Sequence, residues 1–157
     1  MKVKIQDNPQ LTRFLAEIEA LQGKVGWAES AKYPDGKPVA FIASIHEFGA
    51  ASRGIPPRSF MRTALPDAQR AVSAGFAIAV KKAVNGEGNA ETAMTLTVEI
   101  ARGFVHKQLS KMGNYADDNP VVKRRRGRKN PPPNQSTAIL RDTLTMFNTL
   151  TGWVEKK

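Results

Sequence analysis

Cysteine is absent from the 157-residue sequence. This absence excludes disulfide scaffolds, thiolate zinc sites and thiol nucleophiles together, and it fits a reducing compartment. No apolar run approaches the roughly 18–20 residues that span a bilayer, and residues 1–5 lack the apolar core of a signal peptide. We therefore expect no association with a membrane. Glycine and proline, at 12 and 10 residues, are close to average usage, which excludes collagen-like and low-complexity chains.

Patterns typical of catalytic and metal sites are also lacking. His46 lacks the second histidine four residues on that a zinc-binding helix supplies, because position 50 is Ala. His106 is expected to be a solvated helix position. The carboxylate pair Asp117-Asp118 stands beside Asn119-Pro120, whereas acid–base chemistry needs a rigid, partly buried site. With no phosphate-binding glycine loop and no nucleophile elbow in the sequence, we predict a protein that is not an enzyme and has no catalytic residue, metal or cofactor.

Hydrophobic residues make up 41% of the chain, which is enough for a buried core, and the length suits one domain over residues 1–157. Apolar residues that recur at spacings of three and four predict helices, and alternation predicts strands. Asn8-Pro9 is a strong helix start. These patterns predict strands at 2–5, 24–29 and 144–155, and helices at 9–21, 39–48, 59–84 and 89–112. Pro66 lies inside the third of these helices, so that helix either kinks there or begins near Leu65.

The predicted fold class is α+β. A small, mainly antiparallel sheet would carry Val3, Val25, Trp27 and Trp153, with several helices packed on one side. Residues 114–136 hold four prolines and many charges, and they predict a long basic Pro-rich arm.

Positive charge is concentrated in one place. The net charge is +10, and a seven-residue run supplies six of those charges. Arginine predominates in the run, which favours bidentate contact with phosphate or carboxylate. No aromatic residue accompanies it, so nucleic-acid contact would be directed to the backbone and independent of sequence. A solvated loop is the alternative interpretation. The six residues are Lys123, Arg124, Arg125, Arg126, Arg128 and Lys129.

Residues 39–62 contain a distinctive motif. Ile45-His46-Glu47-Phe48-Gly49 ends a predicted helix, and Ile55-Pro56-Pro57-Arg58-Ser59-Phe60 opens the next one. This pattern resembles the Z-type minor tail, or tail-completion, family of long-tailed bacteriophages, in which Pro often stands in place of Ser59. A second segment, 139–154, is similar to a C-terminal feature of the same family, with Ser136-Thr137-Ala138 replacing the usual Asp-Thr-Gly.

The residues of this motif suit a structural role. We expect Ile45 and Phe48 to lie in a core stripe with Phe41 and Ile42, and Phe60 to anchor the return of the loop. Gly49 permits a left-handed exit from the helix, and Pro56-Pro57 stiffens the loop. Glu47 is predicted to pair with Arg58. The loop 49–58 would then present Arg53 and Arg58 to a neighbouring subunit, or the motif would serve packing alone.

The resemblance implies a virion structural protein of the phage neck or tail terminus. Such a protein would form a ring, hexameric by analogy with the sixfold tail, that completes the tail and supports head–tail joining. Its partners would be copies of itself, other neck and tail proteins and, through the basic arm, packaged DNA. It would be found in the virion and, during assembly, in the host cytoplasm. A basic, sequence-nonspecific nucleic-acid-binding protein is the alternative.

Overall fold

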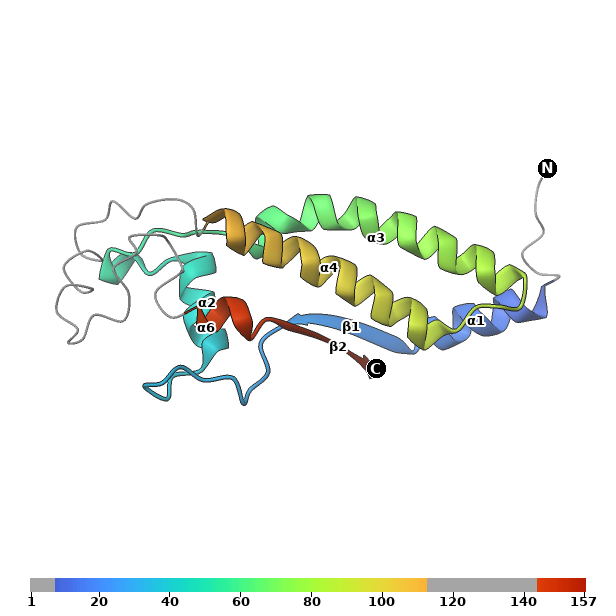
Figure 1. Cartoon of the computed structure of the whole chain (residues 1–157), viewed down its shortest axis with the longest axis horizontal. Coiled ribbons are helices and arrows are strands. Elements are labelled where there is room, and N and C mark those ends of the chain that lie inside the picture. The colour runs from blue at the N-terminus through green and yellow to red at the C-terminus, as the bar shows by residue number, and fades with distance from the viewer. Residues whose placement is uncertain (1–7, 113–143) are drawn as a thin grey trace. The chain divides into compact units, whose positions relative to one another are not determined.

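The computed structural model describes residues 8–112 and 144–157. Within these ranges it has five α-helices and a two-stranded antiparallel sheet, so the α+β prediction is confirmed. The predicted strand at 2–5 and the predicted arm at 114–136 lie outside the described residues. The elements (Figure 1) are α1 (Pro9–Glu19), β1 (Leu21–Gly26), α2 (Val39–Phe48), the 3₁₀ turn η2 (Ala51–Arg53), α3 (Met61–Val84), α4 (Ala90–Met112), α6 (Thr145–Asn148) and β2 (Thr151–Lys156).

The described residues fall into two compact units. Unit 1 takes residues 8–25, 66–103 and 152–157, and unit 2 takes 26–65, 104–112 and 144–151. Helices α3 and α4 each contribute one part to unit 1 and the other part to unit 2. A single domain over the whole chain stays a prediction.

Helix α1 in unit 1 begins as its sequence predicts. Asn8 is the N-cap, and its side-chain oxygen accepts a hydrogen bond from the Leu11 backbone N–H at 3.0 Å. Pro9 occupies the first helical position, where its missing N–H leaves no partner unsatisfied. The Asn8 amide also donates to the Val84 carbonyl at 3.2 Å. The start of α1 is thus tied to the end of α3.

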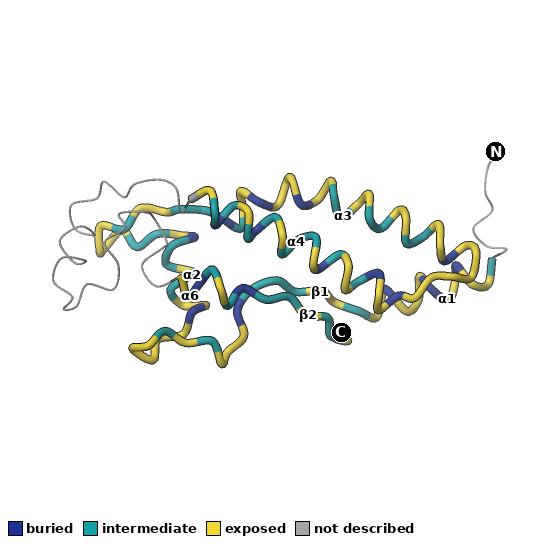
Figure 2. Tube along the Cα trace, viewed as in Figure 1, coloured by how far each residue is buried: buried dark blue, intermediate teal, exposed yellow. Residues whose placement is uncertain are grey.

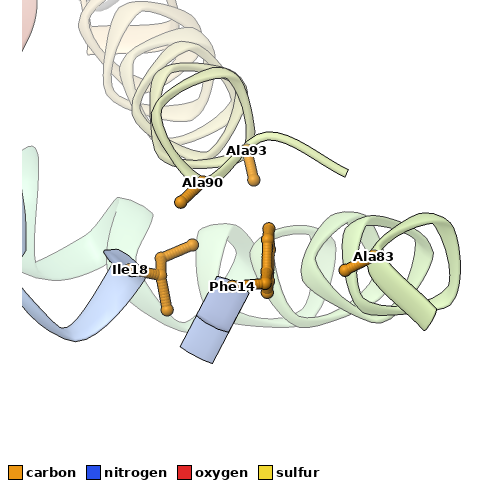
Figure 3. Close-up of a cluster of buried hydrophobic side chains, with 5 residues drawn as sticks. All are labelled: Phe14, Ile18, Ala83, Ala90 and Ala93. Atoms are coloured by element: carbon orange, nitrogen blue, oxygen red, sulfur yellow. The ribbon is translucent and has the colours of Figure 1, made fainter. Parts of the chain in front are cut away.

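The core of unit 1 is a small cluster in which aromatic and branched side chains from α1 meet alanines. Figure 3 shows Phe14 and Ile18 of α1 beside Ala83 of α3 and Ala90 and Ala93 of α4. The small alanine side chains let the helix backbones approach closely around the larger residues. The packing also includes the ring of Phe76, whose centroid is 6.4 Å from that of Phe14.

The sheet consists of β1 and β2. The predicted strand at 24–29 is wrong at both ends, because β1 runs from Leu21 to Gly26 and α1 has already ended at Glu19. Leu21 packs against the helical core cluster. This tertiary contact favours a strand that begins earlier in the chain than the alternation of apolar residues predicted. Trp27 lies just beyond the strand, and Trp153 in β2 is 36% exposed.

Both strands pack tightly on α4 at one glycine each, Gly23 in β1 and Gly152 in β2. A Cβ atom at Gly23 or Gly152 would overlap the side chain of Val98, which is buried in α4. These two glycines therefore allow the strands to approach the helix closely.

We expect Gly152→Ala to lower the free energy of unfolding by about 1–3 kcal/mol, the cost of forcing an extra methyl group into a packed site. Gly103→Ala is the matched control. A Cβ at Gly103 meets nothing within 4 Å, and alanine in a helix interior is favoured over glycine by about 0.5–1 kcal/mol. Urea denaturation of both variants measures the difference, and equal effects would contradict the close approach.

The core of unit 2 forms around Trp27. Its indole N–H donates to the Met146 carbonyl at 2.8 Å, and its ring meets Phe60 edge-on with 5.8 Å between centroids. Phe60 is fully buried, as predicted, and Met146 and Leu150 are 2% and 5% exposed. Helices α2 and α6 lie side by side in this unit (Figure 1).

The predicted strand at 144–155 is only half correct. Residues Thr145–Asn148 form helix α6, and β2 begins at Thr151. Met146 and Leu150 share one face in either conformation, because a spacing of four is both an even number and about one helical turn. Met146 is buried, and in the helical turn its carbonyl accepts the hydrogen bond from the Trp27 indole N–H.

Helices α3 and α4 each carry a stripe of apolar residues at helical spacing, seen as recurring buried positions in Figure 2. Helix α3 begins at Met61, two residues later than predicted, and contains Pro66. Helix α4 begins at Ala90, one residue later than predicted, because Asn89 caps it through a hydrogen bond from the Thr92 N–H at 2.9 Å. The buried members of the two stripes are Ala68, Ala83, Val98, Val105 and Leu109.

Candidate functional site

The motif at residues 45–60 forms the connection between α2 and α3 in unit 2. Helix α2 ends at Phe48 as predicted, and Gly49 leaves it with φ +77°. A Cβ at Gly49 would lie 2.8 Å from the Pro57 nitrogen and 2.9 Å from the Ile55 carbonyl oxygen. Only glycine therefore fits both the backbone conformation and the space at this position.

The loop after Gly49 folds back on itself. Ala50 and Ile55 pair through two backbone hydrogen bonds, of 2.8 and 3.1 Å, and enclose η2. Gly54 then takes a left-handed conformation with φ +65°. Arg53, at the turn of this loop, is exposed. Its contact with a neighbouring subunit stays a prediction.

Glu47 is the centre of the motif. Its residue is only 4% exposed, although it carries a carboxylate. The carboxylate accepts backbone N–H donors from Phe60 at 2.8 Å, Met61 at 3.0 Å and Arg62 at 3.2 Å. These donors are at the start of α3, where a helix has N–H groups without intrahelical partners and a partial positive charge. Glu47 thus caps α3 from the end of α2.

Arg62 completes this arrangement from the first turn of α3. Its Nε donates to the Glu47 carboxylate at 3.0 Å, and its Nη2 donates to the Glu47 carbonyl at 3.0 Å and to Ser59 Oγ at 2.7 Å. The guanidinium carbon also lies 5.0 Å from the centroid of the Phe48 ring, which is a cation–π contact. Arg62 therefore joins the last turn of α2 to the first turn of α3.

The environment of Glu47 favours its charged form. Burial alone would raise its pKa, but the Met61 N–H, the Arg62 side chain and the other backbone donors outweigh burial, so the pKa lies below its usual value. The carboxylate is therefore ionised at neutral pH and balances the charge of Arg62.

The predicted ion pair between Glu47 and Arg58 is wrong, because the arginine that pairs with Glu47 is Arg62. Arg58 is half-buried, and its backbone N–H donates to the His46 carbonyl at 2.7 Å. One signal for this pairing was present in the sequence, because the first turn of α3 has no acidic residue of its own. A helix start without its own acid can be capped by a carboxylate from elsewhere.

The predicted core stripe of α2 is also wrong. Phe41 and Phe48 are 52% and 67% exposed, while the buried residues of α2 are Val39, Ala43 and Glu47. Because α2 is apolar around most of its circumference, its periodicity could not identify the packed side. The two phenylalanines, seven residues apart, lie on one outward face with the half-buried Ile42 and Ile45.

The remaining site predictions have different outcomes. Pro56 and Pro57 are exposed in the loop, and His46 is half-buried near the end of α2. His106 is not simply solvated, because its ring lies 3.8 Å, between centroids, from that of Phe147 in α6. The basic residues Lys123, Arg124, Arg125, Arg126, Arg128 and Lys129 lie outside the described residues, as do residues 139–143 of the second predicted motif.

Comparison with known protein families, curated proteins and solved structures finds no match for this chain. In residues 8–112 and 144–157, no cluster of three potential metal-ligating side chains is found. In the same ranges, no helix is long and apolar enough to cross a membrane. The site that the geometry defines is thus the rigid α2–α3 connection with its exposed aromatic and arginine side chains.

Proposed function

We propose that this protein is a virion structural protein of the phage neck or tail terminus, which forms a ring that completes the tail and supports head–tail joining. The observation that carries the proposal is the motif of residues 45–60, in which the residues that resemble the tail-completion family are held together by one buried carboxylate, Glu47. A motif with this construction supports assembly by protein–protein contact, since its loop keeps one shape.

The surface of the motif is consistent with such a role. It exposes Phe41, Phe48 and Arg53, and more than half of the Arg62 side chain. Aromatic and arginine side chains are the types most enriched at the energetic centres of protein interfaces. Closed rings avoid open-ended filaments, and tail symmetry favours six copies. The partners in this proposal are copies of itself, other neck and tail proteins and packaged DNA.

The proposal is tested by removing the gene from the phage that encodes it and examining the particles by electron microscopy. Separate heads and unjoined tails are expected, together with a ring-sized mass for the purified protein. Normal particles from the deletion strain would overturn the proposal.

The run of basic residues at 123–129 provides a further prediction. Changing Arg124, Arg125 and Arg126 to Glu is expected to abolish infectious particles in complementation, because attraction to DNA or to an acidic subunit becomes repulsion. The free energy of unfolding should change by less than about 0.5 kcal/mol, as for surface substitutions. Thermal melts accompany the assay. A normal particle yield would remove the run from the mechanism.

The alternative function, nonspecific binding of nucleic acid, is favoured by the concentration of charge in residues 123–129. It predicts that the isolated protein binds duplex DNA with an affinity that falls steeply with salt concentration. A ring with negligible affinity for DNA would count against this alternative.

A further inference from the structure

The two-stranded sheet leaves one edge of β2 open. In the part of the chain that the structure describes, β1 and β2 are the only strands and pair with each other. The Lys157 N–H donates to the Ala20 carbonyl at 2.9 Å, at the end of this ladder. Because backbone groups point to alternate sides of a strand, those of Gly152, Val154 and Lys156 point away from β1. A row of such groups is a template for one more strand.

The two faces of β2 have different surroundings. Gly152 approaches α4 so closely that a Cβ would overlap a buried side chain, and Val154, two residues on, lies on the same face. Trp153 and Glu155 lie on the opposite face, where Trp153 is 36% exposed. Glu155 is already paired with Lys24 of β1. Recognition at this edge therefore depends on backbone hydrogen bonds and on the pattern of side chains, and not on a free charge.

The segment of residues 2–5 has a matching pattern. Its sequence, Lys-Val-Lys-Ile, alternates basic and apolar residues and predicts a strand. Beside β2, its apolar side chains would join the face of Val154, and its lysines would join the face of Trp153. Branched and aromatic cross-strand neighbours stabilise a sheet. The edge of β1 offers fewer of them, because two of its six residues are glycine.

The segment cannot reach this edge in its own chain. Asn8 and Ala20 flank α1 and are twelve residues apart, which places them about 18 Å from each other at 1.5 Å per residue. Figure 1 shows that β1 continues away from the start of α1, and β2 ends beside Ala20. Ile5, three residues before Asn8, can extend at most about 11 Å from it. Only a second copy can therefore lay residues 2–5 along β2.

We infer that residues 2–5 of one copy of this chain add to the open edge of β2 in the next copy. The inference rests on the proposed ring and names a contact that would build it. Backbone hydrogen bonds give strand addition its affinity, and alternate side chains give it specificity. Because the donated segment and the receiving edge are different surfaces, the contact is head-to-tail, which is the type that closes into a ring when the rotation allows.

Proline substitutions in the full chain test the added strand. Adjacent N–H groups point to opposite sides, so one of Val3→Pro and Lys4→Pro removes a hydrogen bond to β2 whichever way the segment lies. That variant is expected to associate about tenfold more weakly than the wild type, or worse, in sedimentation velocity. Gln6→Pro is the matched control, because residue 6 lies outside the segment, and it should leave association unchanged. Thermal melts establish that every variant is folded.

Hydrogen exchange measured by NMR locates the contact on β2. At least two of the amides of Gly152, Val154 and Lys156 are expected to exchange about tenfold more slowly in the multimer than in the dilute monomer. The amides of Trp153 and Glu155 point toward β1, so they are the internal control and should exchange equally in both. The slow exchange should be lost in the proline variant that weakens association.

The outcomes separate this inference from the proposed function. A multimer that forms equally well with Val3→Pro and with Lys4→Pro overturns strand addition and leaves the ring in place. Equal weakening by Gln6→Pro overturns it too, as does slow exchange of Val154 in a dilute monomer. A wild-type chain that stays monomeric at about 100 μM overturns both the contact and a self-assembled ring, and the deletion phenotype then decides the neck function independently.

Discussion

Replacing Glu47 with Ala is expected to lower the free energy of unfolding by about 2–4 kcal/mol. The substitution removes the common acceptor for the N–H groups of Phe60, Met61 and Arg62, and a buried donor without a partner costs about 1–3 kcal/mol. Partial hydration of the opened site offsets some of that cost. Glu47→Gln should lose less, because its amide oxygen still accepts hydrogen bonds but without the charge.

Chemical denaturation measures both losses, with Glu17→Ala as the control. Glu17 also forms an ion pair with an arginine, but the pair is exposed on α1, so its removal should leave the free energy of unfolding almost unchanged. Equal small losses for Glu47→Ala and Glu17→Ala would show that the buried carboxylate does not hold the motif together.

The pH dependence of the Glu47→Gln variant provides a further measurement. Because the pKa of Glu47 is lower in the folded state than in the unfolded state, its contribution is present above the unfolded pKa and is lost as pH falls through the folded pKa. The difference in stability between wild type and Glu47→Gln should therefore be constant from pH 7 to about pH 5 and shrink at lower pH. Asp35 and Glu155, whose pKa values are also lowered, are present in both proteins and cancel in the difference.

The second large effect is expected at Phe60. Phe60→Ala should lower the free energy of unfolding by about 3–5 kcal/mol, the range for emptying a buried aromatic site. Phe60 is fully buried and packs edge-on against Trp27. Phe48→Ala should cost less than about 1 kcal/mol, since Phe48 is 67% exposed and loses chiefly its contact with Arg62.

Urea denaturation of the two variants, with unchanged m-values, provides the comparison. The sequence predicted Phe48 in a core stripe and Phe60 as the anchor of the loop, which would bury both. A large loss for Phe48→Ala would restore that interpretation and contradict the outward orientation of α2. A small loss for Phe60→Ala would contradict the packing around Trp27.

Several features were predictable from the sequence because they depend on a few adjacent residues. Asn8-Pro9 starts α1, because the side-chain oxygen of Asn8 accepts a free N–H of the first turn. Helix α2 has the predicted bounds, since Gly49 adopts a conformation that ends it. Each signal acts within one turn, so no knowledge of the rest of the fold is required.

The direction in which α2 faces was decided only by tertiary structure. The buried side consists of Val39, Ala43 and Glu47. A pattern of hydrophobic residues cannot predict this side, because it carries a carboxylate. Its burial is favourable because the start of α3 supplies donors and positive charge there. The partner Arg62 was missed because it lies fifteen residues away, beyond any local pattern.

The end of the described chain shows the same limit in another form. Met146 and Leu150 have a spacing that fits one face of a helix and one face of a strand equally well. The sequence by itself determined that the fold class would be α+β. The hydrogen bond from the Trp27 indole N–H to the Met146 carbonyl joins residues 119 apart in the sequence. It is a tertiary contact of the helical turn that no local pattern contains, because burial of the two side chains suits either conformation.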